Sequence, residues 1–508
     1  MVAQAIANVL TPSCLVLIWF GTIIGIIFGS IPGLSATMAV VLFLPLTFSM
    51  EVTNGLALLV GLYMGGISGG LISAILLKIP GTPSSISTVF DGGPMAEKGE
   101  AGKALGVGIL YSFIGSILGI LALMFISPFL AKVCLLFSAA DYFAVAVFSL
   151  TIIAALSGKD LIKGLFAGLI GLALSMVGMA PLDAVIRYTF GNYQLMNGFD
   201  ITVLLIGVFA VTDIIMAGFG RKHLSDRMQK KKYHLKGYGI SMKEFIQQIP
   251  NAIISSVIGI GIGILPGIGG STAGLISYTA EKSRSKYPEK FGTGIIDGVI
   301  ASETANNAVI GGSLIPLLCM GIPGNTVAAI FLGGLQFHGI APGPLIFQKS
   351  GVYVYGIYFA LIVSSIFMLI FERLGLPVFV KLLDIPKHIL LPCIMVMCCV
   401  GAYSANSRIF DVQCVLFFGL LGLFFKVFKI PSTPLIIGFI LGSMFEENLR
   451  QALQASHGSW SIFVTRPISL IFLIVAVAFC AFTVRGNLRD KKAAEAKGEV
   501  LDTAEEEG

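Results

Sequence analysis

The sequence predicts an all-α polytopic membrane protein, with about 10–12 transmembrane helices plus re-entrant or broken helices in two inverted repeats. Of its 508 residues, 56% are hydrophobic and 12% are charged, which is about half the charged share of a soluble domain. The mean hydropathy is +0.92, so most of the apolar surface must face lipid. Apolar runs long enough for helical spans recur without the alternation of a β-barrel: Ala104–Met124, Tyr142–Leu156, Ile201–Gly218, Val352–Phe371, Ile389–Tyr403 and Ile462–Val484.

Two polar stretches set the domain boundaries. Arg221–Lys236 holds seven Lys or Arg residues and one acidic residue between apolar regions. Short basic segments beside membrane helices stay on the cytoplasmic side. We therefore expect a first transmembrane repeat at 1–220, a basic cytoplasmic linker at 221–245, a second transmembrane repeat at 246–484 and a partly disordered cytoplasmic tail at 485–508.

The repeat is visible in two matching pairs of segments. Gly25–Thr37 reads GIIFGSIPGLSAT and Gly259–Ser271 reads GIGIGILPGIGGS, so the two glycines and the Pro-Gly pair recur 234 residues apart. A second pair, IPGT at Ile79–Thr82 and IPGN at Ile322–Asn325, recurs 243 residues apart. Pro-Gly pairs in the same order in both halves indicate an internal duplication.

Flanking charge indicates that the two repeats are inverted rather than parallel. The loop after the second GxxxGxxPG segment, Glu281–Lys290, has four basic residues, whereas its counterpart Phe48–Asn54 has none. Loops of opposite charge character favour opposite sides of the membrane. Basic loops flank Pro250–Ala280 at both ends, so both ends of this segment should lie on the same side of the membrane. This predicts a hairpin with its bend at Pro266-Gly267.

A Pro-Gly pair deep in an apolar segment breaks the helix and frees backbone groups, which is tolerable in lipid only beside protein or water. Broken helices in transporters point N-termini at anions and carbonyl groups at cations. Small residues follow each break, and most of them carry a hydroxyl or an amide; they include Gly270, Ser84 and Ser85. The candidate substrate- and ion-binding residues are Pro32, Gly33, Ser35, Thr37, Pro80, Gly81, Thr82, Pro266, Gly267, Gly269, Ser271, Thr272, Pro323, Gly324, Asn325 and Thr326.

The alternative for these breaks is structural: kinks, loop turns, or close helix packing through Gly25-x3-Gly29 and Gly259-x3-Gly263. It is strongest at the IPGT and IPGN pair, because Phe90–Lys103 has the composition of an ordinary polar loop.

A second candidate site is the polar cluster ASETANNA at Ala301–Ala308. Glu303, Asn306 and Asn307 fall at helical positions i, i+3 and i+4 and therefore share a face. Ionisable groups inside a membrane usually face a cavity or pathway, so these residues are candidates for a coupling cation or a proton. The alternative is a cluster of satisfied hydrogen bonds between helices.

Other charged residues carry less information. Lys78 precedes a Pro-Gly break and either attracts an anion or snorkels to the interface. Glu372 and Arg373 are expected to pair with each other at a helix end. The five histidines form no spaced pair, and the eight cysteines include no CxxC or Cys/His spacing. The sequence thus predicts no metal centre and no cofactor beyond a coupling ion, Na⁺ or H⁺, and no nucleic-acid binding.

At GSIPGLSAT, GILPGIGGST, ASETANNA and IPGN, the sequence resembles the large membrane subunit of the tripartite tricarboxylate transporter family, from about Ala5 to Val484. The family's motif positions fall on Pro32, Gly33, Pro266 and Gly267. The resemblance implies a permease of the bacterial inner membrane that takes up a carboxylate with an ion gradient, usually Na⁺, and not with ATP. It also implies two partners, a small membrane subunit and a periplasmic solute-binding protein, and makes an elevator-like movement plausible.

Two other classes of protein compete with the carrier. An anion channel also uses broken helices, but channels typically assemble from short subunits, whereas here the breaks are duplicated within one chain. An intramembrane lipid-modifying enzyme would need a His/Asp, Cys/His or metal constellation, and the apolar segments contain none. The sequence leaves open which carboxylate is bound.

Overall fold

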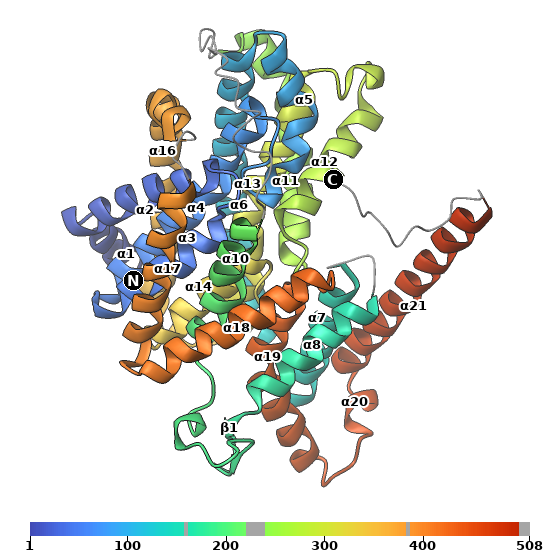
Figure 1. The fold of residues 1–508 in the computed structure, drawn as a ribbon. Helices are drawn as coiled ribbons and strands as arrows, with labels where there is room; N and C mark the ends of the chain where they lie inside the picture. The colour runs from blue at the N-terminus through green and yellow to red at the C-terminus, as the bar shows by residue number, and fades with distance from the viewer. Residues whose placement is uncertain (157–160, 220–238, 383–386, 497–508) are drawn as a thin grey trace. The chain divides into compact units, whose positions relative to one another are not determined.

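The computed structural model describes residues 1–156, 161–219, 239–382 and 387–496. Most of the predicted basic linker and the last twelve residues therefore lie outside the described residues. The described chain is helical apart from one pair of two-residue antiparallel strands, β1 (Gly178–Met179) and β2 (Ile186–Arg187). The predicted all-α class is confirmed (Figure 1).

Seven helices among the described residues are long and apolar enough to cross a membrane. The twenty-five residues of α13 are not among them, since this helix carries the predicted polar cluster. Six shorter apolar helices accompany the seven. The seven candidate spans are Pro12–Ser30, Val52–Leu76, Ala101–Cys134, Met242–Ile264, Gly351–Phe379, Ile389–Asn406 and Ile409–Val427.

The contacts divide the chain into two compact units, and each unit takes segments from both halves of the sequence. Unit 1 comprises Met1–Leu136 and Asp200–Phe424. Its elements are α1 (Val2–Val9), α2 (Pro12–Ser30), α3 (Ala36–Phe43), η1 (Leu44–Ser49), α4 (Val52–Leu76), η2 (Pro83–Ser85), α5 (Ile86–Glu97), α6 (Ala101–Cys134), α9 (Ile201–Leu205), η4 (Ile206–Val211), α10 (Thr212–Phe219), α11 (Met242–Ile264), α12 (Gly269–Arg284), η5 (Pro288–Lys290), α13 (Ile296–Met320), α14 (Thr326–Phe337), α15 (Ile346–Lys349), α16 (Gly351–Leu382), α17 (Lys387–Asn406) and most of α18 (Ile409–Val427).

Unit 2 comprises Phe137–Phe199 and Phe425–Gly508. Three ion pairs join its two segments: Arg187 binds Glu446 through two guanidinium nitrogens, Arg450 pairs with Asp183, and Arg466 lies 2.9 Å from the buried Asp141. Bidentate pairs of this kind are stronger than ordinary surface ion pairs. Its elements are α7 (Ala139–Leu156), α8 (Leu161–Ser175), β1, β2, η3 (Tyr193–Leu195), α19 (Ser432–Ala455), α20 (Ile462–Thr465) and α21 (Pro467–Ala496).

Three sequence expectations need correction or refinement. Phe90–Lys103 is not simply a polar loop, because α5 continues to Glu97 through Pro94. Its Asp91 accepts backbone hydrogen bonds from the segment before α13, which gives these polar residues a tertiary role. The apolar run at 462–484 is divided into α20 and α21 just before Pro467, and α21 continues to Ala496, into the predicted tail.

Two helix pairs in unit 1 pack through glycines at very short range. Figure 1 shows α2 beside α4 in unit 1, and α11 packs against α13 in the same way. A methyl group added to Gly69 of α4 would lie 2.5 Å from the carbonyl oxygen of Ile26, and one added to Gly312 of α13 would lie 2.6 Å from that of Ile260. Backbones this close leave no room for a side chain.

These contacts predict that Gly69→Val and Gly312→Val destabilise the protein, because overpacking against a backbone typically costs about 1–3 kcal/mol or more. Thermal unfolding of the detergent-solubilised chain, followed by size-exclusion chromatography, measures the loss. Gly261→Val is the matched control, since nothing lies within 4 Å of a methyl group at that position of α11. An equal loss in all three variants would contradict the packing argument.

The helices α4 and α13 run antiparallel. In the middle of α4, the Tyr63 hydroxyl lies 2.9 Å from Ser313 in the second half of α13. Near the end of α4, Leu71 shares a core cluster with Val299 at the start of α13, and both face Gly108 of α6. The α2–α4 pair and the α11–α13 pair are therefore joined by contacts between α4 and α13, which run in opposite directions.

Candidate functional site

Each of the four predicted Pro-Gly pairs lies between two helices. In the first, α2 ends at Ser30 and Gly33 adopts a φ of 94°, a conformation that an L-residue rarely takes. The Ser35 hydroxyl then accepts a hydrogen bond from the Met38 amide and caps α3. The predicted ligand Ser35 is thus a helix cap, and Thr37 is half-buried beside it on α3.

The second pair, Pro80-Gly81, follows the end of α4 and lies against the first. A methyl group on Gly81 would overlap the carbonyl oxygen of Gly29 and crowd the Ser73 hydroxyl. Thr82 and Ser85 form a capping box at η2, so Thr82 also serves the local fold.

A direct backbone hydrogen bond joins the third and fourth Pro-Gly pairs. The Gly267 amide donates to the Gly324 carbonyl at 2.9 Å, and Gly267 has a φ of 78°. The Asn325 side chain caps α14 by accepting from the Ala328 amide at 2.8 Å. The predicted bend at Pro266-Gly267 is confirmed, since α11 ends at Ile264 and α12 begins at Gly269.

The start of α12 has no side-chain cap. Its N-cap residue is Ile268, which offers no hydrogen-bonding side chain, so the first amide groups of the helix are left for another partner. Thr272 turns its hydroxyl back toward the Ile268 carbonyl at 3.5 Å, while Ser271 and Thr326 are half-buried.

An amide side chain from the polar cluster faces this uncapped end. Asn306 is 1% exposed, and its Oδ1 atom lies where a side chain on Gly270 would go. Neither amide atom of Asn306 meets a hydrogen-bond partner at good geometry in the described part of the chain, although the side chain lies within electrostatic reach of Glu303. The Ser84 side chain, from the segment after the second break, lies on the other side of Gly270. Buried polar atoms without partners are rare and mark places where another group binds.

A second set of contacts joins the fourth break to α4. The Asn325 amide donates to the Tyr63 hydroxyl at 2.7 Å, and Tyr63 in turn meets Ser313. These three residues are buried. The elements after all four breaks also pack against one another within unit 1, α3 on α14 and α12 on η2 and α5.

The polar cluster also contains one buried carboxylate, that of Glu303. Glu303 is 0% exposed and accepts hydrogen bonds from Thr88, from Ser112 at 3.0 Å and from Asn307 at 3.4 Å. Glu303 and Asn307 thus contact each other, while Asn306 faces α12. Between described residues, no ion pair involves Glu303.

Sequence reasoning misread one charged position and missed several polar ones. Glu372 does not pair with Arg373: it is 0% exposed and accepts from Ser68 at 2.9 Å, whereas Arg373 is exposed. Lys78 forms an ion pair with Glu97. Tyr63 could have been noticed as a polar aromatic in an otherwise apolar run, but nothing local to it indicates Asn325 as its partner.

The fold and this site define a class of protein: a multi-pass helical membrane transporter with a polar network built on interrupted helices. The chain belongs to the tripartite tricarboxylate transporter TctA family, whose sequence profile matches residues 15–437. It is therefore a membrane transporter subunit for tricarboxylates, not an enzyme, and transporters of this family have further subunits.

Two relatives from Agrobacterium vitis are similar to the chain. One, described as an uncharacterized 52.8 kDa protein in the TAR-I ttuC′ 3′ region, is 35% identical over 485 residues, which is 95% of each chain. The other, an uncharacterized protein in the TAR-II ttuC′ 3′ region, is 36% identical over 231 residues, covering 46% of this chain and 96% of the relative. No solved structure matches the chain.

Proposed function

We propose that this chain takes up a tricarboxylate or another carboxylate across the bacterial inner membrane, driven by an ion gradient, with Na⁺ as a coupling ion. In this proposal it is the permease of a tripartite system, associates with a small membrane subunit and receives its substrate from a periplasmic solute-binding protein. The substrate binds where the four interrupted helices meet.

One observation carries this proposal: the uncapped start of α12 faces the unpartnered amide of Asn306 and the side chain of Ser84. A helix start with free N–H groups attracts an anion. The Asn306 amide and the Ser84 hydroxyl add donors that suit a carboxylate. Glycines 269 and 270 leave room for the ligand to approach the backbone.

An inverted repeat supports this location. Contacts in the first half recur between the equivalent residues of the second half: Gly25 with Leu62 and Gly259 with Ala305, Gly69 with Ile26 and Gly312 with Ile260, Gly81 with Gly29 and Gly324 with Gly263. The equivalent helices α4 and α13 are antiparallel, as inverted repeats require. Carriers of this architecture bind substrate between their repeats, near the bilayer midplane.

Glu303 supports the choice of a coupling cation. Its carboxylate accepts hydrogen bonds from the hydroxyl groups of Thr88 and Ser112 and from the amide nitrogen of Asn307. The carboxylate and the two hydroxyl groups supply oxygen atoms, and hard cations prefer oxygen ligands. A cation there would neutralise a carboxylate that no basic side chain pairs with in the described residues. Na⁺ binding at Glu303 would thereby favour the nearby binding of an anionic substrate.

The direct test is uptake of labelled carboxylates into proteoliposomes that contain this chain and both partners. Na⁺ and pH gradients are imposed separately, and a panel of tri-, di- and monocarboxylates is compared. We expect concentrative uptake that collapses when the Na⁺ gradient is dissipated. Uptake that only equilibrates the substrate, whatever the Na⁺ gradient, would favour an anion channel and overturn the proposal.

A further inference from the structure

Unit 1 contains another fully buried carboxylate, Glu372 of α16, which the substrate site does not use. Its Oε2 atom meets the Ser68 hydroxyl of α4 at 2.9 Å, while Oε1 has no hydrogen-bond partner in the described chain. The side chain is 0% exposed and lies within a candidate membrane span, Gly351–Phe379. A carboxyl group in such a place needs either a cation or a proton.

The surroundings of Glu372 do not supply a cation. Of the helices packed on α16, α1 has no ionisable side chain, α2 carries only Cys14, α4 only Tyr63, and the short α15 only the exposed Lys349. The ionisable side chains of α6 are Lys103, Tyr111, Lys132 and Cys134, and Lys103 is paired with Glu244. No described basic residue forms an ion pair with Glu372.

The oxygen ligands at Glu372 are too few for a metal ion. One hydroxyl approaches it, and the residues one turn away, Leu369 and Leu376, belong to or pack on an apolar cluster with Leu71 and Ile72. Na⁺, like other hard cations, needs several oxygen ligands. Protonation needs none, and the Ser68 hydroxyl can accept a hydrogen bond from a carboxylic acid as readily as it donates one to a carboxylate.

Glu372 also interacts electrostatically with Glu303. Two like charges in a low-dielectric interior disfavour each other, so it is costly for both carboxyl groups to be charged together. Glu303 has three donors aimed at it and Glu372 has one, so the negative charge is better stabilised on Glu303. The proton therefore belongs to Glu372.

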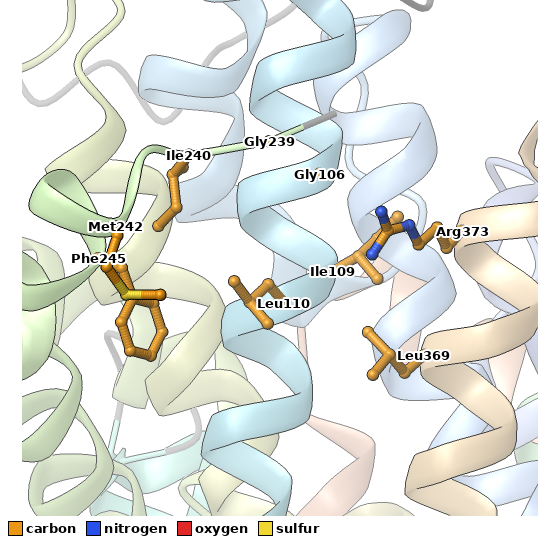
Figure 2. A pocket seen from close by; sticks show the side chains of 9 residues that line it. All are labelled: Gly106, Ile109, Leu110, Gly239, Ile240, Met242, Phe245, Leu369 and Arg373. Carbon is orange, nitrogen blue, oxygen red and sulfur yellow. The ribbon is translucent and has the colours of Figure 1, made fainter. Parts of the chain in front are cut away.

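A cavity lies beside the turn of α16 that carries Glu372, although Glu372 is not among the residues that line it. It has a volume of about 390 Å³ and is lined by α6, α16 and the segment at the start of α11. Figure 2 shows Arg373 extending from α16 toward Ile109 of α6, with Leu369 one turn away. On a helix, the side chains of Leu369 and Arg373 project about 60° and 100° to either side of Glu372. The cavity that these two residues line therefore lies next to the face of α16 that carries the carboxyl group. Gly239 and Ile240, which lie toward the end of the predicted basic linker, also line it.

From this arrangement we propose that Glu372 is a proton-binding site of the transport cycle, exchanging its proton through the cavity between α6 and α16 and coupled by charge to Glu303. The proposal rests on the proposed function and adds a proton to the ions that move with the substrate. The basic linker places the open side of the cavity toward the cytoplasm.

Infrared difference spectroscopy of the purified full chain, between acidic and alkaline buffers, tests the proton site without requiring transport. We expect a carbonyl-stretch band of a buried carboxylic acid in the wild type and in the control Glu289→Gln, which alters an exposed carboxylate. Glu372→Gln should lose this band. If that variant does not fold, Ser68→Ala removes the hydrogen bond and should shift the band. The proposal would be overturned if the variant that folds, Glu372→Gln or Ser68→Ala, gave the same spectrum as the wild type.

Proteoliposomes with both partners test the coupling. An inward proton gradient should stimulate carboxylate uptake by the wild type and by Glu289→Gln, whereas in Glu372→Gln the ratio of uptake with and without that gradient should fall to one. Na⁺-driven uptake with an unchanged pH response in Glu372→Gln would overturn the proton site and leave the proposed function standing. No uptake by the wild type would instead overturn the proposed function, and with it the coupling role.

Discussion

Gly267→Leu is expected to abolish carboxylate uptake while the protein still reaches the membrane. Gly267 adopts a φ of 78°, which a leucine reaches only with strain. Its amide also donates to Gly324, the bond that joins the third break to the fourth. A residue that cannot hold this conformation would displace the start of α12 from Asn306. Uptake should fall to the level of empty vesicles, about 100-fold or more if the site loses ~3 kcal/mol of binding energy.

The matched control is Gly261→Leu in α11, the helix that precedes Gly267. Nothing lies within 4 Å of a side chain added there, and the residue is exposed, so this variant should retain uptake. Membrane insertion of both variants is checked by the amount of protein in purified membranes. Normal uptake by Gly267→Leu would argue against a binding site at the third break.

Asn306→Ala should have the second largest effect. The amide of Asn306 is buried, has no hydrogen-bond partner among the described residues and faces the uncapped start of α12. Removing an unpartnered buried amide costs the fold little, because no hydrogen bond within the protein is lost. It would cost the substrate one or two hydrogen bonds to a carboxylate, about 1.5–3 kcal/mol each, so KM should rise by about 10-fold or more.

The readouts for Asn306→Ala are the concentration dependence of uptake and the thermal unfolding temperature. Asn448→Ala in α19 is the control, since Asn448 donates to the Met444 carbonyl of its own helix and lies in unit 2. A variant with wild-type KM would remove Asn306 from the binding site. A large loss of thermal stability with unchanged KM would assign it a structural role instead.

The sequence predicted the positions of the helix breaks because the cause is local. Proline and glycine interrupt a helix wherever they occur together, and the matching offsets of 234 and 243 residues identified equivalent breaks before any fold was known. The shared face of Glu303 and Asn307 was also predictable from helical periodicity.

What the sequence could not predict is which distant groups meet. Ser35, Thr82 and Asn325 look alike as hydroxyl and amide residues after a break, yet all three cap helices. Glu372 and Arg373 are adjacent in the chain, and adjacency suggested a pair, but successive residues on a helix point about 100° apart. Whether such a carboxylate faces Ser68 or solvent depends on helix packing, which a periodic apolar pattern does not encode.

Unit 2 is assembled from two segments that are far apart in the chain, which affects the order in which its helices are synthesised. Its first helices, α7 and α8, are synthesised long before α19 and α21, with which they pack. Until the ribosome has finished nearly the whole polypeptide, α7 and α8 have only each other and lipid as neighbours from this unit. A nonsense mutation after α18 would therefore leave an early-made pair of helices without the partners that complete their fold, and membrane quality-control proteases recognise such orphaned segments.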